Sequence, residues 1–212
     1  RQGASPDDRL IDQAVEIDVG GSEVWRPTDG APPSGEAMRL SDGLAYSKNT
    51  ITAQLIQQVG PAKVARLARH MGVRQSKLEA VPSLALGTSP VTLKEMVAAY
   101  GTIANGGGYL EPLLVSRIED RDGRVIEEFS PQAPDVALKP DVAYTLLDSL
   151  RGVINRGTGR DIRGRYGLRA DVAGKTGTTQ DNTDGWFILM HRQLVGGAWV
   201  GFNDSRVTLR SD

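Results

Sequence analysis

Apolar residues recur at helical spacing through the middle of the chain and follow a strand-like alternation nearer its ends. In residues 50–59, for example, Ile51, Leu55, Ile56 and Val59 fall on one helical face, as in a helix that buries one stripe. The same spacing predicts five helices, at residues 38–46, 50–59, 62–71, 92–104 and 141–155.

Local start and stop signals support these helices. Thr92 and Glu95 form a capping-box pattern, in which each side chain accepts a hydrogen bond from the other residue's backbone N–H. Pro140 suits the start of the last helix, because its fixed φ fits a first helical turn. Gly60-Pro61 separates the second helix from the third, and glycines 106–108 end the fourth.

The strands gather toward the end of the chain. Residues 113–118 and 124–129 flank Asp122-Gly123, which predicts a hairpin. Three runs, at 172–178, 185–190 and 194–202, predict neighbouring antiparallel strands. Residues 1–37 are expected to be irregular, apart from a short strand at 14–19 and a loop at 26–35. Helices in the middle and strands at one end favour the α+β class.

Composition narrows the possible chemistry. The chain has 212 residues, 24% of them charged, and a net charge of -1, which gives no electrostatic footprint for nucleic acid. The absence of cysteine excludes a disulfide framework, a thiolate zinc site and a cysteine nucleophile. Two histidines are too few for a histidine-rich metal centre, so no metal or cofactor is predicted. No signal peptide and no apolar run near 18 residues is found, and a start at Arg1 rather than Met indicates a fragment.

The first chemical motif is Lys175-Thr176-Gly177-Thr178, on a predicted strand after Gly174. Lysine supplies a positive charge, and Gly177 lets a ligand lie against the strand backbone. Because strand side chains alternate, Lys175 and Gly177 share a face, and an edge N–H could stabilise an oxyanion. The alternative is a polar edge strand that lysine protects from pairing.

The second motif is Ser47-Lys48-Asn49, between two predicted helices. A short polar loop there can direct a hydroxyl, an ammonium and an amide into one cleft. Ser47 could relay a proton and Asn49 could hold a substrate amide. The alternative is that Asn49 or Thr50 simply caps the following helix.

Taken together, the two motifs stand in the order S-x-N then K-T-G that serine penicillin-recognising enzymes share. The chain resembles the penicillin-binding proteins, most closely the transpeptidase module of the bifunctional class A type. The resemblance runs over about residues 14–204. Its further segments are 44–50, 85–92 with 104–107, 156–160 and 184–187.

This resemblance implies a fold and a function. The fold would be a helical subdomain beside an antiparallel sheet, as in serine β-lactamases and penicillin-binding transpeptidases, incomplete at both ends. Residues 1–212 would form a partial transpeptidase domain, with the helical subdomain at about 38–106 and the hairpin, a helix and the K-T-G strands at about 110–212. The parent would cross-link peptidoglycan stem peptides ending in D-Ala-D-Ala, react with β-lactams, and work on the extracytoplasmic face of the membrane.

Site roles follow from the same resemblance. Ser47 would pass a proton toward the leaving nitrogen, and Lys175 would orient Ser47 and supply positive charge. Asn49 would bind the substrate backbone. Thr176 and Thr178 would lie near the terminal carboxylate, with the Thr178 N–H as an oxyanion donor, and Gly177 would keep the strand open.

One expected motif is missing. No serine in the chain has a lysine three residues later, so the S-x-x-K nucleophile is absent. We therefore expect the chain alone to be inactive and to need a preceding segment of the same domain as a partner. A non-catalytic module that binds peptidoglycan or β-lactams remains an alternative. A serine β-lactamase is a weaker one, because Lys48 stands where class A β-lactamases carry aspartate.

Overall fold

The computed structural model describes residues 3–179, 182–202, 204 and 206–209. The helices are α1 (Leu40–Ala45), α2 (Asn49–Val59), α3 (Pro61–Met71), the 3-10 helix η1 (Pro82–Leu86), α4 (Leu93–Ala104), α5 (Pro140–Asn155) and α6 (Asp161–Gly164). The strands are β1 (Arg9–Ile11), β2 (Ile17–Gly20), β3 (Glu23–Trp25), β4 (Ala37–Arg39), β5 (Gly108–Tyr109), β6 (Arg117–Glu119), β7 (Val125–Glu128), β8 (Asp135–Val136), β9 (Ala173–Thr178), β10 (Asp184–His191) and β11 (Leu194–Gly201).

The main sheet consists of β9, β10 and β11, and it confirms the predicted antiparallel strands. Its order is β11-β10-β9, so in the described chain the K-T-G strand β9 is an outer strand. Lys175 lies opposite Ile188, and Gly177 lies opposite Trp186 on β10. The motif therefore sits at a sheet edge.

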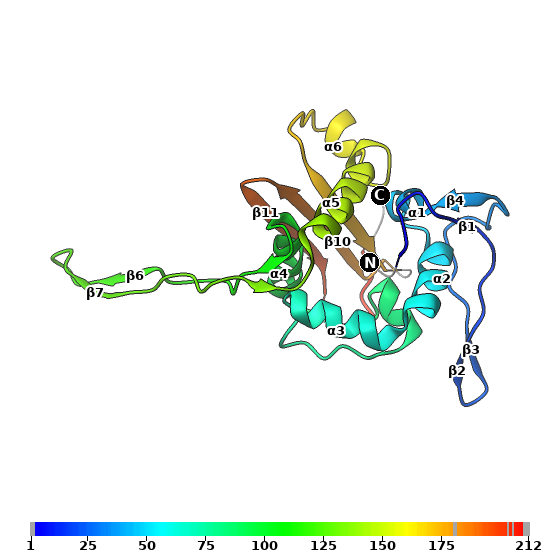
Figure 1. The fold of residues 1–212 in the computed structure, drawn as a ribbon, viewed down its shortest axis with the longest axis horizontal. Coiled ribbons are helices and arrows are strands. Elements are labelled where there is room, and N and C mark those ends of the chain that lie inside the picture. Colours follow the sequence, from blue (N-terminus) through cyan, green and yellow to red (C-terminus); the bar gives the residue numbers. More distant parts are fainter. Residues whose placement is uncertain (1–2, 180–181, 203, 205, 210–212) are drawn as a thin grey trace.

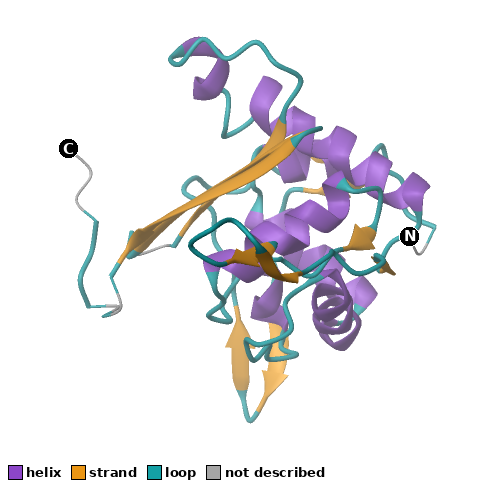
Figure 2. Cartoon of the chain, turned by 90° about the vertical axis from the view of Figure 1, so that its left-hand side faces the viewer, coloured by secondary structure: helices purple, strands orange, loops and turns teal. Residues whose placement is uncertain are grey.

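Helices α4 and α5 pack against this sheet (Figures 1 and 2). The core between them joins Val153 of α5 and Ile103 of α4 to Ala173 of β9 and Met190 of β10. Removing such side chains from water is the main favourable term in folding. The arrangement confirms the α+β class and packs the buried side of β9 against α5.

Helices α2 to α5 confirm the predicted ones to within two residues at each end. The capping box is also confirmed, because Thr92 Oγ1 accepts from Glu95 N while Glu95 Oε2 accepts from Thr92 N. Glu95 is buried and also accepts hydrogen bonds from the backbone of Gln75 and Ser76, which ties α4 to the preceding loop. Within the described chain, no helix is both long and apolar enough to cross a membrane.

The N-terminal region differs from the prediction. Residues 1–37 were expected to be irregular, yet β1 pairs with β4 over three residues each. This pairing occupies residues 37–39, so the helix predicted at 38–46 begins only at Leu40. The strand predicted at 14–19 is instead β2, at residues 17–20, in a hairpin with β3. These short pairs depend on contacts between distant residues, which local patterns do not encode.

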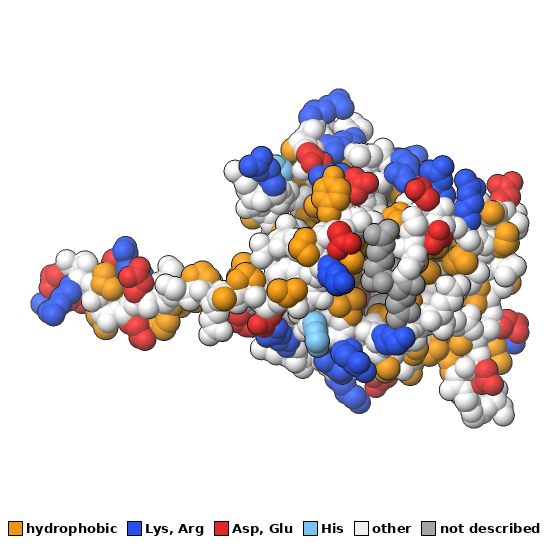
Figure 3. All heavy atoms as spheres, viewed as in Figure 1, with side chains coloured by type: hydrophobic (Ala, Val, Ile, Leu, Met, Phe, Trp, Pro, Cys, Tyr) orange, Lys and Arg blue, Asp and Glu red, His pale blue; other side chains and the backbone are white. Residues whose placement is uncertain are grey.

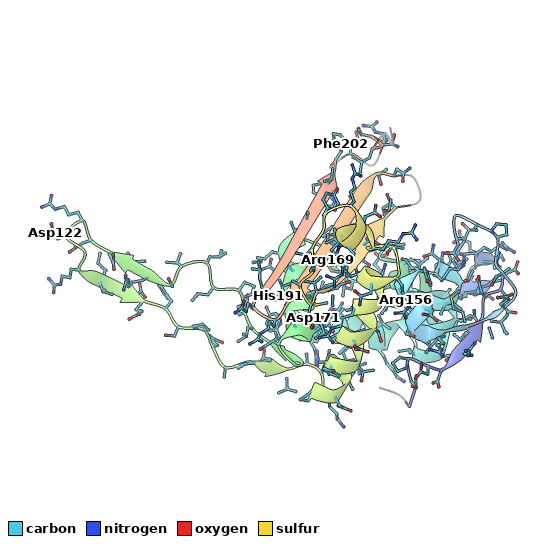
Figure 4. All side chains as sticks on the ribbon, turned by 90° about the horizontal axis from the view of Figure 1, so that it is seen from above. Asp122, Arg156, Arg169, Asp171, His191 and Phe202 are labelled. Carbon is cyan, nitrogen blue, oxygen red and sulfur yellow. The ribbon has the colours of Figure 1, made fainter. Side chains whose placement is uncertain are left out.

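The predicted hairpin around Asp122-Gly123 is present, with shorter strands β6 and β7 than the sequence indicated. It forms an arm that projects from the body, rooted where β5 pairs with β8 (Figure 1). Figure 4 shows Asp122 at its tip, and Figure 3 shows mixed charged and hydrophobic side chains along it. Leu114 and Ile126 are 86% and 67% exposed, so the arm contributes little to the core.

Candidate active site

The two motifs meet at one hydrogen bond. Lys175 Nζ donates to Ser47 Oγ at 2.8 Å, across 128 residues of sequence. The same ammonium donates to the backbone oxygen of Thr176 at 2.9 Å. The structure thus brings Ser47 and Lys175 together, as the resemblance implied.

Ser47 is presented by the end of α1. Its N–H donates to Leu44 O and the N–H of Lys48 donates to Gly43 O, which is the Schellman pattern of helix termination. In this pattern the first residue after the C-cap adopts the left-handed conformation, and here that residue is Ser47, with φ 56°. Glycine is usual at such positions, because a Cβ is strained there. A serine in this conformation is consistent with a position held for function rather than for stability.

Lys175 projects from β9 into a half-buried position. Burial disfavours the ammonium and lowers the pKa of Lys175 from its usual value to about 8. A lysine in this range holds a positive charge at neutral pH but gives up its proton more readily than an exposed lysine. Such an ammonium can donate a hydrogen bond to the neighbouring Ser47 hydroxyl and can take part in proton transfer.

Asn49 is the first residue of α2 and is tied to the loop at 26–35. Its side-chain Nδ2 donates to Thr28 O, and its backbone N–H donates to Asp29 Oδ1, each at 2.8 Å. Neither Asn49 nor Thr50 caps α2 with its own side chain, so the alternative that one of them serves only as a helix cap is wrong. Asp29 supplies a carboxylate to the helix N-terminus instead, where negative charge is favourable.

Beneath the serine loop lies a buried ionic cluster. Lys48 Nζ lies 3.1 Å from Asp12 Oδ2 and 3.7 Å from Asp29 Oδ2. Asp12 is fully buried and also accepts from Thr50 Oγ1 and from Ser34. Burial alone would raise the pKa of Asp12, but these hydrogen bonds and Lys48 outweigh it and lower the pKa to about 2. The cluster ties the residues that follow Ser47 to the segments that carry Asp12 and Asp29.

A turn at residues 156–159 connects the two walls of the site. Arg156 forms a salt bridge with Asp42 of α1 at 2.8 Å, and Thr158 N donates to Ala45 O at 3.1 Å. A Cβ on Gly157 would lie 2.0 Å from Ala45 O, so only glycine fits. On its other side, the Thr158 hydroxyl hydrogen-bonds the Thr176 hydroxyl at 2.5 Å.

The remaining K-T-G residues lie toward the open end of β9. Thr178, its last residue, is exposed and pairs with Gly185. A Cβ on Gly177 would meet Trp186 Cβ at 3.2 Å, so glycine also allows the two strands to pack closely there. The sequence alone did not assign roles to Asp12, Asp29 or Thr158. The glycine-threonine turn was a recognisable signal, whereas the two aspartates lie in loops without a pattern.

Comparison with known proteins decides the family. A model of the penicillin-binding protein transpeptidase domain matches residues 1–193. The chain belongs to the penicillin-binding protein transpeptidase family. Penicillin-binding protein 1A of Neisseria meningitidis is 34% identical over 185 residues, which cover 85% of this chain and 23% of that protein. The Aquifex aeolicus penicillin-binding protein 1A is 36% identical, covering 85% of this chain and 24% of that protein.

Solved structures agree with this family. The crystal structure of penicillin-binding protein 1A from Haemophilus influenzae matches with a TM-score of 0.89 and 26% identity, over 98% of this chain and 36% of that one. The penicillin-binding protein PonA1 of Mycobacterium tuberculosis shares the fold, with a TM-score of 0.83 and 22% identity, over 98% of this chain and 58% of that one. The chain spans about a quarter of the length of the curated penicillin-binding proteins it matches.

Proposed function

We propose that this chain is part of a peptidoglycan D,D-transpeptidase that cross-links stem peptides through an acyl-enzyme and is acylated by β-lactams. The observation that carries the proposal is the 2.8 Å hydrogen bond between Lys175 and Ser47. It joins the S-x-N and K-T-G motifs into one site. Family membership supports the reaction class, and the contact between Ser47 and Lys175 supports the roles proposed below.

In this mechanism an upstream serine, outside this chain, attacks the penultimate D-alanine carbonyl of a stem peptide. Ser47 passes a proton toward the leaving nitrogen, and Lys175 orients the Ser47 hydroxyl and holds positive charge beside it. D-Alanine leaves, and the amine of a neighbouring stem then attacks the acyl-enzyme. The loop from Thr28 to Asp29 keeps Asn49 at the start of α2, where it would bind the substrate backbone.

The K-T-G strand would bind the acyl-donor end of the substrate. Thr176 and Thr178 would lie near the terminal carboxylate, the Thr178 N–H would be an oxyanion donor, and Gly177 would leave room beside the backbone. Lys175 adds the positive charge that an anionic group requires nearby. No cofactor or metal is needed for this chemistry.

We also infer that another segment of the same protein completes the domain. The chain lacks an S-x-x-K motif. Strand β11 is the other outer strand of the sheet in the described residues, and its Leu194 and Val200 are 72% and 60% exposed. An unpaired strand with exposed apolar side chains is a template for another strand. The preceding segment of the parent would add there and bring the nucleophile.

The parent would act on the extracytoplasmic face of the bacterial membrane, anchored through its N-terminus. Within it, residues 1–212 would be a partial transpeptidase domain, with the helical part at about 38–106 and the sheet part at about 110–212. Its ligands would be stem peptides ending in D-Ala-D-Ala and β-lactams rather than nucleic acid.

Labelling with a fluorescent penicillin tests this function. A polypeptide that adds the upstream segment of the gene to this chain should form a stoichiometric, slowly hydrolysed adduct, while the chain alone should form none. Rapid loss of the adduct would indicate a β-lactamase. The missing S-x-x-K favours one other candidate, a non-catalytic binding module, and the longer polypeptide would then bind penicillin without forming a covalent adduct.

A further inference from the structure

The hydroxyl of Thr158 occupies a position that no assigned role explains. It lies 2.5 Å from the hydroxyl of Thr176, the residue after Lys175. Thr158 is exposed and Thr176 is half-buried, so the pair faces solvent rather than the core. A threonine pair used only for packing would be expected to bury its methyl groups. This pair instead leaves two hydroxyls near the surface, one of them on the residue that follows Lys175 in the K-T-G motif.

The backbone around Thr158 is held on both sides. Thr158 N donates to Ala45 O at 3.1 Å, and Gly159 N donates to Val153 O at 3.0 Å. Gly157 fits against Ala45 O only because it has no Cβ. The backbone of Thr158 is therefore fixed relative to α1, which ends two residues before Ser47, and relative to α5, which packs against β9.

Hydrogen-bond directions determine what this contact does. A hydroxyl donates one proton and accepts through two lone pairs. If Thr158 donates to Thr176 Oγ1, the proton of Thr176 is free to point toward a ligand. The ammonium of Lys175 donates to the backbone oxygen of Thr176, and its positive charge on this segment of β9 favours an anionic ligand group. A donor fixed before binding costs less entropy when the ligand arrives.

We propose that Thr158 is a positioning residue, whose hydroxyl donates to Thr176 Oγ1 and thereby directs the Thr176 O–H toward the carboxylate of the substrate or β-lactam. The inference rests on the proposed function, because it assigns a further residue to the same site. Thr158 acts through Thr176 and makes no bond to the reacting atoms. Its contribution concerns recognition of the carboxylate, not proton transfer.

The test uses the longer polypeptide that carries the nucleophilic serine, with Thr158→Val, Thr158→Ser, Thr176→Val and the Thr158→Val/Thr176→Val double variant. Acylation is measured with a penicillin and with its methyl ester, which lacks the negative charge. Thr158→Val should weaken initial binding of the acid about fivefold, as for loss of one hydrogen bond between neutral groups. The limiting acylation rate should change by less than about twofold, and Thr158→Ser should stay within about twofold of the parent.

Two further comparisons separate positioning from structural support. The ester should react with the parent and with Thr158→Val at rates within about twofold of each other, since it has no carboxylate to orient. The double variant should bind the acid no more weakly than Thr176→Val alone, because Thr158 acts through Thr176. Thr145→Val is a matched control, because it removes a threonine hydroxyl on α5 that bonds only locally, to Asp141 O.

Each contrary result overturns the inference. Equal losses for acid and ester would show that Thr158 only supports the fold, as would a loss that Thr158→Ser fails to restore. Additive losses in the double variant would show that Thr158 acts independently of Thr176. An unchanged Thr158→Val would refute the role while leaving the transpeptidase assignment intact. If the unsubstituted longer polypeptide is not acylated at all, the proposed function fails and this inference fails with it.

Discussion

Lys48 stands between Ser47 and Asn49 in the sequence, but its ammonium lies 3.1 Å from the fully buried carboxylate of Asp12. Lys48, the middle residue of the S-x-N motif, therefore anchors the loop to the buried Asp12. This contact links the N-terminal segment to the site, although the two are separated by strands β2 to β4 and helix α1.

Asp12→Asn should destabilise the fold by about 3 kcal/mol, because it leaves the Lys48 ammonium without its buried counter-charge. Urea denaturation measures the change. The double variant Asp12→Asn/Lys48→Met should recover part of the loss, since the ammonium left behind by Asp12→Asn is removed, while Asp29 keeps its hydrogen bond from Asn49 N. If the double variant loses the sum of both single effects, the ion pair is not what holds the loop.

The same carboxylate predicts a dependence of stability on acid. The folded-state pKa of Asp12 is lowered to about 2, below the usual value of an aspartate. Its stabilising contribution is therefore complete above the unfolded value and is lost as the pH falls from about 4 through about 2. Between about pH 4 and about pH 2, the melting temperature of the Asp12→Asn variant should fall less steeply than that of the unsubstituted protein. An identical decline in both proteins would contradict the assignment.

Substitutions at Ser47 separate conformation from chemistry. Both Ser47→Ala and Ser47→Gly remove the hydroxyl to which Lys175 donates a hydrogen bond. Both should abolish transpeptidase turnover in the longer protein. Ser47→Gly should nevertheless be more stable than Ser47→Ala by about 1 kcal/mol, because φ 56° strains any residue with a Cβ. Thermal unfolding of the two variants is the measurement. Equal stability would mean that the loop relaxes when the hydroxyl is lost.

Gly157→Ala should destabilise the fold by about 3 kcal/mol, since its Cβ would lie 2.0 Å from Ala45 O and force α1 away from the turn. The matched control is Gly164→Ala in α6, where a Cβ meets nothing within 4 Å. That substitution should be neutral or slightly stabilising, as alanine is a better helix former. Chemical denaturation of the pair checks the contrast, and similar effects at both positions would refute it.

Lys175→Met should remove a dependence of stability on alkaline pH. Burial lowers the folded-state pKa of Lys175 to about 8, below the usual lysine value of about 10.4, so the ammonium form is destabilising in the fold. Stability should rise as the pH increases from about 8 to about 10.5, where the unfolded chain still binds the proton. In Lys175→Met this rise should vanish, while Ser47 loses its partner. A rise of the same size in the variant would assign it to another group.

Helices were predictable from the sequence where one element carried its own signals. The Thr92–Glu95 capping box and the apolar stripe of α2 are local, and the structure follows them. The pairing of β1 with β4 was missed, because three-residue strands give almost no periodic pattern and their stability comes from each other.

The site shows the same division. Two short motifs in the right order indicated that Ser47 and Lys175 belong together, and they do. The residues that support the site, Asp29 and Asp12, could not be predicted from the sequence. Asp29 reaches the N-terminus of α2 from a loop twenty residues earlier, where local rules point to Asn49 or Thr50 as the cap. Asp12 gains its role only when folding buries it beside Lys48.

Strand β9 carries the K-T-G motif at an outer position of its sheet in the described chain. A strand with an open edge pairs with any extended backbone of suitable shape, including that of a neighbouring molecule. The position that admits a ligand thus exposes the protein to self-association when no ligand is there. Aggregation and β-lactam binding would then involve the same strand edge. A β-lactam added during purification would cover that edge and reduce aggregation.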